Sequence, residues 1–318
     1  MRNVTCSTNP AWSINETPIK ITTHDGYRLT AIVFEDTRPH RPSRPIAIIG
    51  GGVAIPQTFY APFARYLASQ GTTVITFDYR GIGGSLNTHA RDITARLVDW
   101  GQKDIPAILA YAKSTYPDSP IHWIGHSLGG GFGVALAHNN ALIDRHLGIA
   151  VPHGYWGLMS GNERYRVAAL IGIVLPTLAY TCGYIPGKLT GLGENLPKHI
   201  ALEWRRWILN PNSMWGSLPA KDLTASQTLR APMHILRFSD DPWASEQSVE
   251  QILKCFTGAK HRSIACIQPQ DANAKHIGHN GFFRTRFATT LWPRACAWLN
   301  QSETGLQQSP QQQPSSRH

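Results

Sequence analysis

The sequence of 318 residues is 42% hydrophobic and 16% charged, a globular composition that excludes fibrous, collagen-like and wholly disordered proteins. Lys and Arg outnumber Asp and Glu by 30 to 20, so the formal net charge is +10. Because the basic residues are scattered, in pairs such as Arg205-Arg206, and form no long run, the sequence predicts no nucleic-acid partner.

The first half of the chain alternates between strand and helix patterns. His24-Asp25-Gly26 is a turn signal between two strand patterns, and the later strands are short apolar runs typical of a buried parallel sheet. Strands are predicted over residues 19–23, 27–34, 45–49, 73–77, 121–124 and 147–151, and helices over 59–68, 95–112 (bent near Pro106) and 129–138. This alternation predicts an α/β fold with a doubly wound, mostly parallel sheet.

The alternation stops at residue 152. Residues 153–224 are rich in aromatic residues and glycine and show helical fragments without a buried strand, as expected of an inserted helical cap. The pattern resumes with strands over 233–237 and 262–267 and helices over 246–254 and 286–299. The predicted domains are an N-terminal extension (1–17), a core (18–152 and 225–300), the cap (153–224) and a disordered tail (301–318) rich in Gln, Ser and Pro.

One segment of the cap raises the question of a membrane. Residues 167–185 contain no charged residue, and a run of this length is close to that of a membrane-spanning helix. Pro176 in its middle would interrupt a helix, and nearby Thr and Gly residues dilute its apolarity. We therefore expect a buried or substrate-lining helical hairpin, with a membrane segment as the alternative.

The cysteines and the N-terminal residues bear on the compartment. Five cysteines lie far apart without a C-x-x-C pair, which argues against a zinc site and against a dense disulfide framework. The first twenty residues lack the apolar region and cleavage site of a secretory signal. These features predict a cytoplasmic protein without a metal site.

A candidate nucleophile follows the predicted strand 121–124. Gly125-His126-Ser127-Leu128-Gly129 is a G-x-S-x-G motif between a strand and a helix pattern. In this setting the glycines permit a sharp turn that lifts the serine hydroxyl above the sheet. The motif therefore indicates Ser127 as a catalytic nucleophile, whereas an ordinary glycine-rich turn is the alternative interpretation.

A serine nucleophile needs a base, and the base needs a carboxylate to orient it. Asp240 and Asp241 both follow the predicted strand 233–237, where such an acid is expected. His276 and His279 both follow the last predicted strand, and we favour His279 because it lies between two glycines in a loop that allows close approach. No third ligand accompanies the two histidines, so the pair predicts no metal.

The oxyanion of acyl transfer needs two backbone N–H donors. Leu128, the residue after the nucleophile, supplies the first. Gly51-Gly52-Val53, after the strand 45–49, supplies the second, through the N–H of Val53 or, alternatively, of Ala54. Neither a phosphate-binding loop pattern nor a dinucleotide-binding pattern follows a strand, so we expect no cofactor.

Taken together, these segments resemble the α/β-hydrolase superfamily. Besides the serine motif, the segment Asp78-Tyr79-Arg80-Gly81-Ile82-Gly83-Gly84-Ser85 is similar to the family's D-x-R-G-x-G-x-S segment. A narrower resemblance is to a bacterial group of predicted hydrolases similar to serine aminopeptidases and lysophospholipases. It rests on Pro56-Gln57 with Tyr60, His153-Gly154-Tyr155-Trp156, Leu192-Gly193-Glu194-Asn195-Leu196-Pro197, and Gly278-His279 before Gly281-Phe282-Phe283.

The resemblance covers roughly residues 18–299 and implies the fold, a Ser/Asp/His triad and acyl transfer or hydrolysis. It favours Asp241 over Asp240, because Pro242-Trp243-Ala244 resembles the end of the family's acid loop. The sequence departs from the family at Gly51-Gly52-Val53, where many relatives have a His-Gly pair, and this departure weakens the assignment of the second oxyanion donor.

The predicted function is hydrolysis of a small-molecule ester or thioester by Ser127, His279 and Asp241. Tryptophans of the cap would cover the site with apolar surface, or would instead form the core of the cap; they are Trp156, Trp204, Trp207 and Trp215. The candidate substrate contacts are Trp156, Trp207 and Trp243. The alternatives are a peptidase or acyltransferase, a non-catalytic scaffold that binds a hydrophobic ligand or partner, and contact of the cap with a lipid surface. The oligomeric state stays open.

Overall fold

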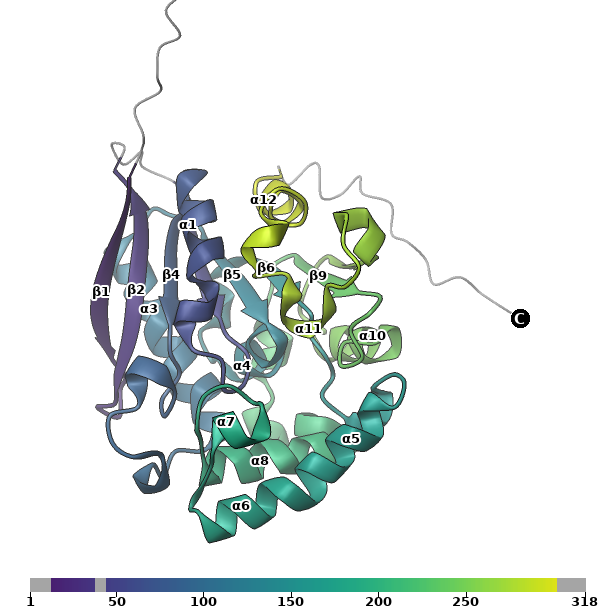
Figure 1. Cartoon of the computed structure of the whole chain (residues 1–318). Coiled ribbons are helices and arrows are strands. Elements are labelled where there is room, and N and C mark those ends of the chain that lie inside the picture. The colour runs from purple at the N-terminus through teal and green to yellow at the C-terminus, as the bar shows by residue number, and fades with distance from the viewer. Residues whose placement is uncertain (1–12, 38–43, 302–318) are drawn as a thin grey trace, which may run out of the picture.

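The computed structural model describes residues 13–37 and 44–301. An eight-stranded sheet forms its centre, and helices cover both of its faces (Figure 1). In their order across the sheet, the strands are β1 (Ile14–Thr22), β2 (Arg28–Asp36), β4 (Thr73–Phe77), β3 (Ile46–Gly50), β5 (Ile121–His126), β6 (Ile143–Ile149), β9 (Met233–Phe238) and β10 (Arg262–Ile267). Residues 1–12 of the predicted extension and 302–318 of the predicted tail lie outside the described residues.

The sheet is antiparallel at its first two strands and parallel from β4 to β10. This arrangement confirms the predicted α/β fold with a mostly parallel sheet. Every residue of β3, β4 and β5 is buried, because helices cover both faces of the central strands. The continuous apolar runs in the sequence reflect this two-sided burial.

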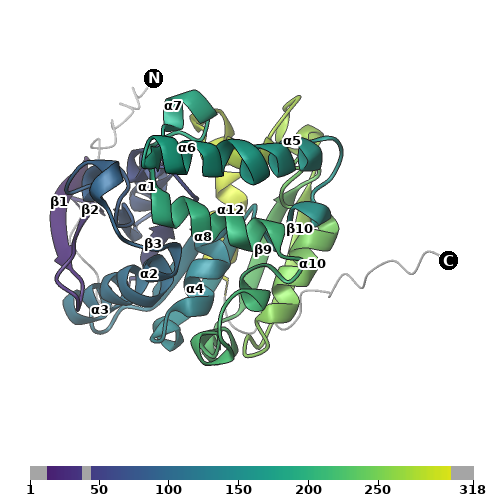
Figure 2. The ribbon, with the colours of Figure 1, turned by 90° about the horizontal axis from the view of Figure 1, so that it is seen from below.

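Helices pack on both faces of the sheet. In Figures 1 and 2, α1 and α12 lie on one face, and α3 and α4 lie on the other. The helices of the core are α1 (Ala61–Ser69), α2 (Leu97–Asp99), α3 (Ile105–Thr115), α4 (Phe132–Leu136), α9 (Ala225–Thr228), α10 (Glu246–Cys255), α11 (Gly278–Gly281) and α12 (Trp292–Leu299). Those of the cap are α5 (Glu163–Ala169), α6 (Leu175–Thr181), α7 (Gly187–Thr190) and α8 (Lys198–Leu209). Figure 1 shows the cap below the sheet, on the side of α11.

Two strands begin earlier than predicted. The residues near their starts are polar or exposed, so an apolar pattern did not reveal them. β1 begins at Ile14 instead of residue 19, and so runs into the predicted N-terminal extension; four of its first five residues are exposed. β6 begins at Ile143 instead of residue 147, and the exposed Asp144 there accepts a hydrogen bond from the backbone N–H of Ile121. An apolar pattern does not detect strand ends of this kind.

Two helices are shorter than predicted. The helix predicted over 129–138 is a 3₁₀ turn (Ser127–Gly130) followed by the short helix α4, because a run of glycines disfavours regular helix. The helix predicted over 286–299 starts only at Trp292, and Pro293 lies in its first turn, where a missing N–H is not needed.

The uncharged cap segment is not the predicted hairpin. Residues 163–181 form one continuous helix from α5 through a π-helical stretch (Leu170–Val174) into α6. Pro176 is the second residue after the π stretch, just as Pro106 is the second residue after another π stretch (Trp100–Asp104), in the first turn of α3. Proline lacks a backbone N–H and cannot make the normal hydrogen bond of an α-helix. The π turn before it changes the hydrogen-bond pattern at this point, so the helix continues beyond the proline.

Within residues 13–37 and 44–301, no helix combines the length and the apolarity that a membrane crossing requires.

The cap also contains a small two-stranded sheet that the sequence did not predict, formed by β7 (Tyr184–Ile185) and β8 (Leu196–Pro197).

Buried histidines make the stability of this core sensitive to acid. Burial lowers the pKa of His122 to about 4 and the pKa of His126 and of His146 to about 3. These rings stay neutral in the folded state but take up a proton near pH 6.5 when the chain unfolds. Because the unfolded state binds more protons below that pH, stability is complete above about pH 6.5 and falls as the pH drops toward about 4.

We expect the thermal unfolding temperature to fall steadily between pH 7 and pH 4.5. Each buried histidine contributes up to about 1.4 kcal/mol per pH unit to this loss. The variant His122→Gln should show a weaker pH dependence than the wild type, whereas the same change at the exposed His261 should not alter it. An unfolding temperature that does not change over this range would contradict the prediction.

Candidate active site

Ser127 lies at the sharp turn between β5 and α4. Its backbone φ is +51°, a left-handed conformation that is unfavourable for a residue with a side chain. Such a conformation costs about 1–3 kcal/mol and persists only where the surroundings enforce it. The strand β5 before the turn is fully buried, while Ser127 itself is partly exposed. The turn therefore presents the hydroxyl at the end of a rigid strand.

The two glycines of the motif are required by close backbone contacts. A Cβ atom on Gly125 would overlap the Cα of Gly130, and a Cβ atom on Gly129 would overlap the carbonyl oxygen of Gly50. Both neighbours are main-chain atoms and cannot rotate away. The G-x-S-x-G pattern is thus explained by the packing of the turn against itself and against the end of β3.

Ser127, His279 and Asp241 form a chain of hydrogen bonds. The Oγ of Ser127 lies 2.9 Å from Nε2 of His279 in α11, and Nδ1 of the same ring lies 2.8 Å from Oδ2 of Asp241. The side chain of Asp241, after β9, is fully buried, and its Oδ1 accepts a hydrogen bond from the backbone N–H of Trp243. This is the geometry in which an imidazole can remove the proton of a serine hydroxyl.

The alternative acid and base form a separate pair beside this chain. Oδ2 of Asp240 lies 2.6 Å from Nδ1 of the exposed His276. The carboxylate of Asp240 also accepts hydrogen bonds from the backbone N–H groups of Ile277 and Gly278. Asp240 thus fixes the loop that carries His279, and neither Asp240 nor His276 is hydrogen-bonded to Ser127 in the described part of the chain.

The predicted oxyanion donors belong to two segments that meet at Ser127. A Cβ atom on Gly52 would stand 3.5 Å from the Cβ of Ser127, so the loop after β3 passes next to the nucleophile. Within the described ranges, the N–H groups of Val53 and Leu128 have no hydrogen-bond acceptor. Two free donors at this position suit a developing negative charge.

Ala54, the alternative donor, connects this loop to the cap. Its φ is +57°, and its carbonyl oxygen accepts a hydrogen bond of 2.9 Å from the backbone N–H of Glu194. The neighbouring Gly193 lies so close to this carbonyl that a Cβ atom there would be 2.7 Å from it. The cap loop 191–195 therefore holds the oxyanion loop directly.

Tyr60 and His126 connect the oxyanion loop to the base, and the sequence alone did not indicate this role. The Oη of Tyr60 accepts the N–H of Gly52 at 2.8 Å and lies 2.9 Å from Nδ1 of His126. Nε2 of His126 lies 3.0 Å from the carbonyl oxygen of His279. Tyr60 can donate a hydrogen bond to Nδ1 of His126. His126 then carries its proton on Nε2 and donates a hydrogen bond to the backbone carbonyl oxygen of His279.

Burial keeps this connection uncharged. Tyr60 and His126 are both almost fully buried. Burial and the nearby His279 lower the pKa of His126 to about 3, and burial raises the pKa of Tyr60. Because both groups stay neutral near neutral pH, the direction of each hydrogen bond is fixed.

The predicted tryptophans take different positions. The ring of Trp243 lies 5.8 Å from that of His279, and Trp204 of α8 stacks on Trp243 at 6.3 Å with the planes 8° apart. Trp207 is buried against Phe132, and Trp156 packs beside Tyr155. Of the three predicted substrate contacts, Trp243 is the one whose ring lies beside that of His279 in the described part of the chain. Trp204, in the cap, packs against the Trp243 ring.

Comparison with known proteins agrees with this architecture. Residues 44–147 match the protein-family model described as alpha/beta hydrolase fold. A search of curated protein sequences found no match.

Several solved structures are similar over most of their length. An esterase of Pyrococcus furiosus matches 90% of this chain and 90% of its own, with a TM-score of 0.56 and 17% identity. A soluble variant of monoglyceride lipase from Saccharomyces cerevisiae, in complex with a substrate analogue, matches 92% of this chain and 98% of its own, with a TM-score of 0.65 and 14% identity. An esterase domain of a Rhodothermus marinus protein matches 89% and 97%, with a TM-score of 0.53 and 16% identity. The chain therefore has the α/β-hydrolase fold.

Removing the hydroxyl of Tyr60 should misplace the oxyanion loop. In Tyr60→Phe, the buried N–H of Gly52 and Nδ1 of His126 both lose their partner, at a cost of about 1–3 kcal/mol per group. We expect the rate of reaction of Ser127 with a fluorophosphonate probe to fall roughly tenfold to a hundredfold. With a substrate, kcat should fall more than KM rises, because the loop acts on the transition state.

Tyr66→Phe is the matched control, since Tyr66 lies on α1, which begins directly after Tyr60, and its hydroxyl makes no hydrogen bond within the described residues. Thermal unfolding of both variants measures the cost in stability separately from reactivity. Equal labelling rates for Tyr60→Phe and the wild type would show that Tyr60 does not position the loop.

Proposed function

We propose that the protein is a serine hydrolase that cleaves carboxylic esters or thioesters through an acyl-enzyme. The observation that carries this proposal is the hydrogen-bonded chain from Ser127 through His279 to the buried Asp241. Two free backbone N–H groups next to the serine support it further.

In the proposed mechanism, Ser127 Oγ attacks the acyl carbon while its proton passes to Nε2 of His279. The carbonyl electrons move onto the oxygen, which the N–H groups of Leu128 and Val53 stabilise. Asp241 holds the ring of His279 and stabilises its positive charge. The intermediate then collapses, the bond to the alcohol or thiol breaks, and His279 gives its proton to this leaving group. Water, activated by the same histidine, releases the acid and restores Ser127.

The surroundings of the serine favour an apolar acyl group. Trp243 and Trp204 form stacked aromatic walls next to His279, and apolar walls of this kind suit hydrocarbon chains. Similar structures include esterases and a monoglyceride lipase, which also supports an ester substrate. Peptidases and acyltransferases use the same triad, so the choice among them rests on a substrate panel.

Labelling with a fluorophosphonate probe tests the nucleophile. The wild type should be labelled, and Ser127→Ala should not be. The same two proteins are then assayed on ester, thioester and aminoacyl-amide substrates of several chain lengths, where we expect the wild type to cleave an ester or thioester and the variant to lose at least about a thousandfold in rate. Equal labelling of both proteins, or turnover of amides alone, would reject the proposal. Without labelling or turnover, a non-catalytic scaffold becomes the better interpretation.

The two neighbouring aspartates provide a matched pair of variants. Asp241→Asn should lower kcat by about a factor of ten thousand, because the amide no longer stabilises the protonated His279. Asp240→Asn should lower kcat less than about tenfold, because in the described residues the carboxylate of Asp240 pairs with His276 and backbone N–H groups and not with His279. The reverse order, measured as kcat on the same ester, would assign the triad acid to Asp240.

A further inference from the structure

The exposed apolar side chains of this protein gather on one part of the cap. Within the described residues, the large hydrophobic side chains that are mostly exposed are Tyr165, Ile173, Val174, Tyr180 and Leu189, between 43% and 74% exposed. They lie on the continuous helix 163–181 and on the adjacent α7. Isolated exposed apolar residues are ordinary, whereas a concentration on one surface marks an interaction site. We call this surface the outer cap face.

The helix 163–181 is apolar on both of its sides over most of its length. Val167, Ile171, Leu175 and Ala179 recur every four residues and are fully buried against the rest of the cap. The opposite side is uncharged from residue 167 to the end of the helix. A helix that only covered a core would carry charged residues on its outer side.

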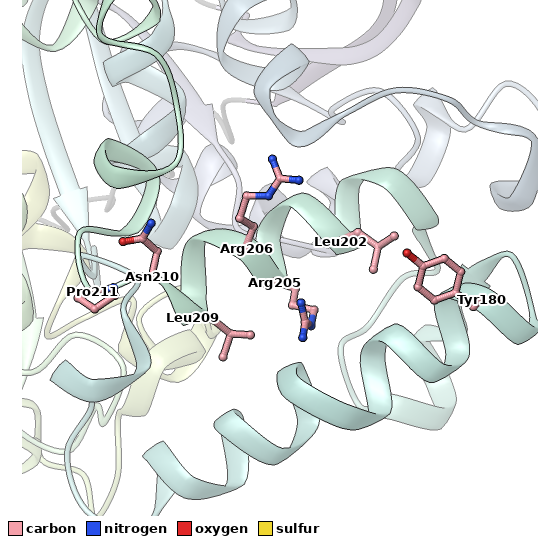
Figure 3. Close-up of a pocket in the computed structure, with 7 residues that line it drawn as sticks. All are labelled: Tyr180, Leu202, Arg205, Arg206, Leu209, Asn210 and Pro211. Carbon is pink, nitrogen blue, oxygen red and sulfur yellow. The ribbon is translucent and has the colours of Figure 1, made fainter.

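Cations without acidic partners lie beside the outer cap face. A groove of about 530 Å³ separates α6 from α8, and its walls contain two arginines and no carboxylate (Figure 3). It is lined by Tyr180, Leu202, Arg205, Arg206, Leu209, Asn210 and Pro211. Figure 3 shows Arg205 reaching from α8 toward the opposite helix. The Nζ of Lys198 stands 4.4 Å above the ring of Tyr180.

Two of the cap's carboxylates are already engaged elsewhere. Glu163 pairs with Arg166, and Glu203 pairs with Arg96. In the part of the chain that the structure describes, no ion pair involves Arg205, Arg206 or Lys198. The positive charge beside the outer cap face is therefore available to an external anion.

We propose that the outer cap face docks on an anionic lipid membrane surface. The apolar side chains would enter the acyl layer, while Arg205 and Lys198 would bind the phosphate groups above it; Arg206 points to the other side of α8 (Figure 3). A helix of 19 residues, about 28 Å long, lies flat on such a surface and does not cross it. A second copy of this chain is a poor occupant, because each copy has a net charge of +10 and would present the same cations to the other.

Docking at this face is independent of the proposed chemistry. The helix is linked to the site by Glu163, which accepts a hydrogen bond of 3.2 Å from Nε1 of Trp243. In the described residues, no exposed apolar residue of the outer cap face is hydrogen-bonded to Ser127, His279 or Asp241. The variant Ser127→Ala should therefore bind membranes like the wild type, and it prevents hydrolysis of any lipid during the measurement.

Sedimentation with lipid vesicles tests the proposal. Full-length Ser127→Ala is mixed with vesicles of phosphatidylcholine alone or with added phosphatidylglycerol. We expect binding to the anionic vesicles, weaker binding at high salt, and little binding to phosphatidylcholine alone. Arg205→Gln combined with Lys198→Gln should weaken binding about thirtyfold. Ile173→Asp and Leu189→Asp should each weaken it about tenfold or more.

Two control variants make the same changes in charge outside the cap: one removes two positive charges, and the other adds one negative charge. Lys254→Gln with Lys260→Gln, and Thr257→Asp, alter exposed residues outside the cap and should bind like the parent protein. Ile173 and Leu189 are exposed and lie on different elements, so the unfolding temperature of each variant should match the parent, and misfolding of one leaves the other as the test.

Three results would overturn the proposal. The first is no binding of the parent protein to anionic vesicles, and the second is binding of all cap variants with unchanged affinity. The third is a dimer in analytical ultracentrifugation that Ile173→Asp abolishes, which would assign the outer cap face to a second copy of the chain.

Discussion

The left-handed turn at Ser127 is the constraint on which the site depends. Such a conformation survives only where packing enforces it, and here Gly125 and Gly129 allow the turn to press against Gly130 and the end of β3. The fully buried strand β5 anchors the turn from below. A side chain at Gly129 would separate the turn from the end of β3, and with it Ser127 from the loop that carries the proposed oxyanion donors, whereas a side chain at Gly125 would collide with Gly130 within the turn itself.

The other parts of the site are connected to this turn mainly through backbone groups. Tyr60 joins the N–H of Gly52 to His126, His126 reaches the carbonyl of His279, and Asp240 binds two backbone N–H groups of the base loop. Because the pKa of His126 is lowered to about 3 by burial, this connection carries no charge that could disturb His279. Hydrogen bonds through the neutral Tyr60 and His126, together with those to the carboxylate of Asp240, thus hold the loops around Ser127.

The cap has two different surfaces. Toward the core, Trp204 stacks on Trp243, and the backbone of Glu194 holds Ala54, so the cap shapes both the wall and the oxyanion loop of the site. Toward solvent, the helix 163–181 exposes apolar side chains. The outward surface is continuous because this helix passes Pro176 without breaking, with a π stretch just before the proline.

The sequence by itself determined the fold class and indicated Ser127, because a buried strand and a glycine-rich turn are patterns of neighbouring residues. It missed the polar ends of β1 and β6 and expected a break at Pro176, since the sheet and the π stretch override local preference. The flanking glycines favoured His279 over His276, and the family resemblance favoured Asp241 over Asp240, but neighbouring residues alone could not place either pair against Ser127. Only the tertiary structure decided which pair faces Ser127, what Tyr60 and His126 do, and which apolar residues of the cap stay exposed, because these depend on contacts between residues far apart in the chain.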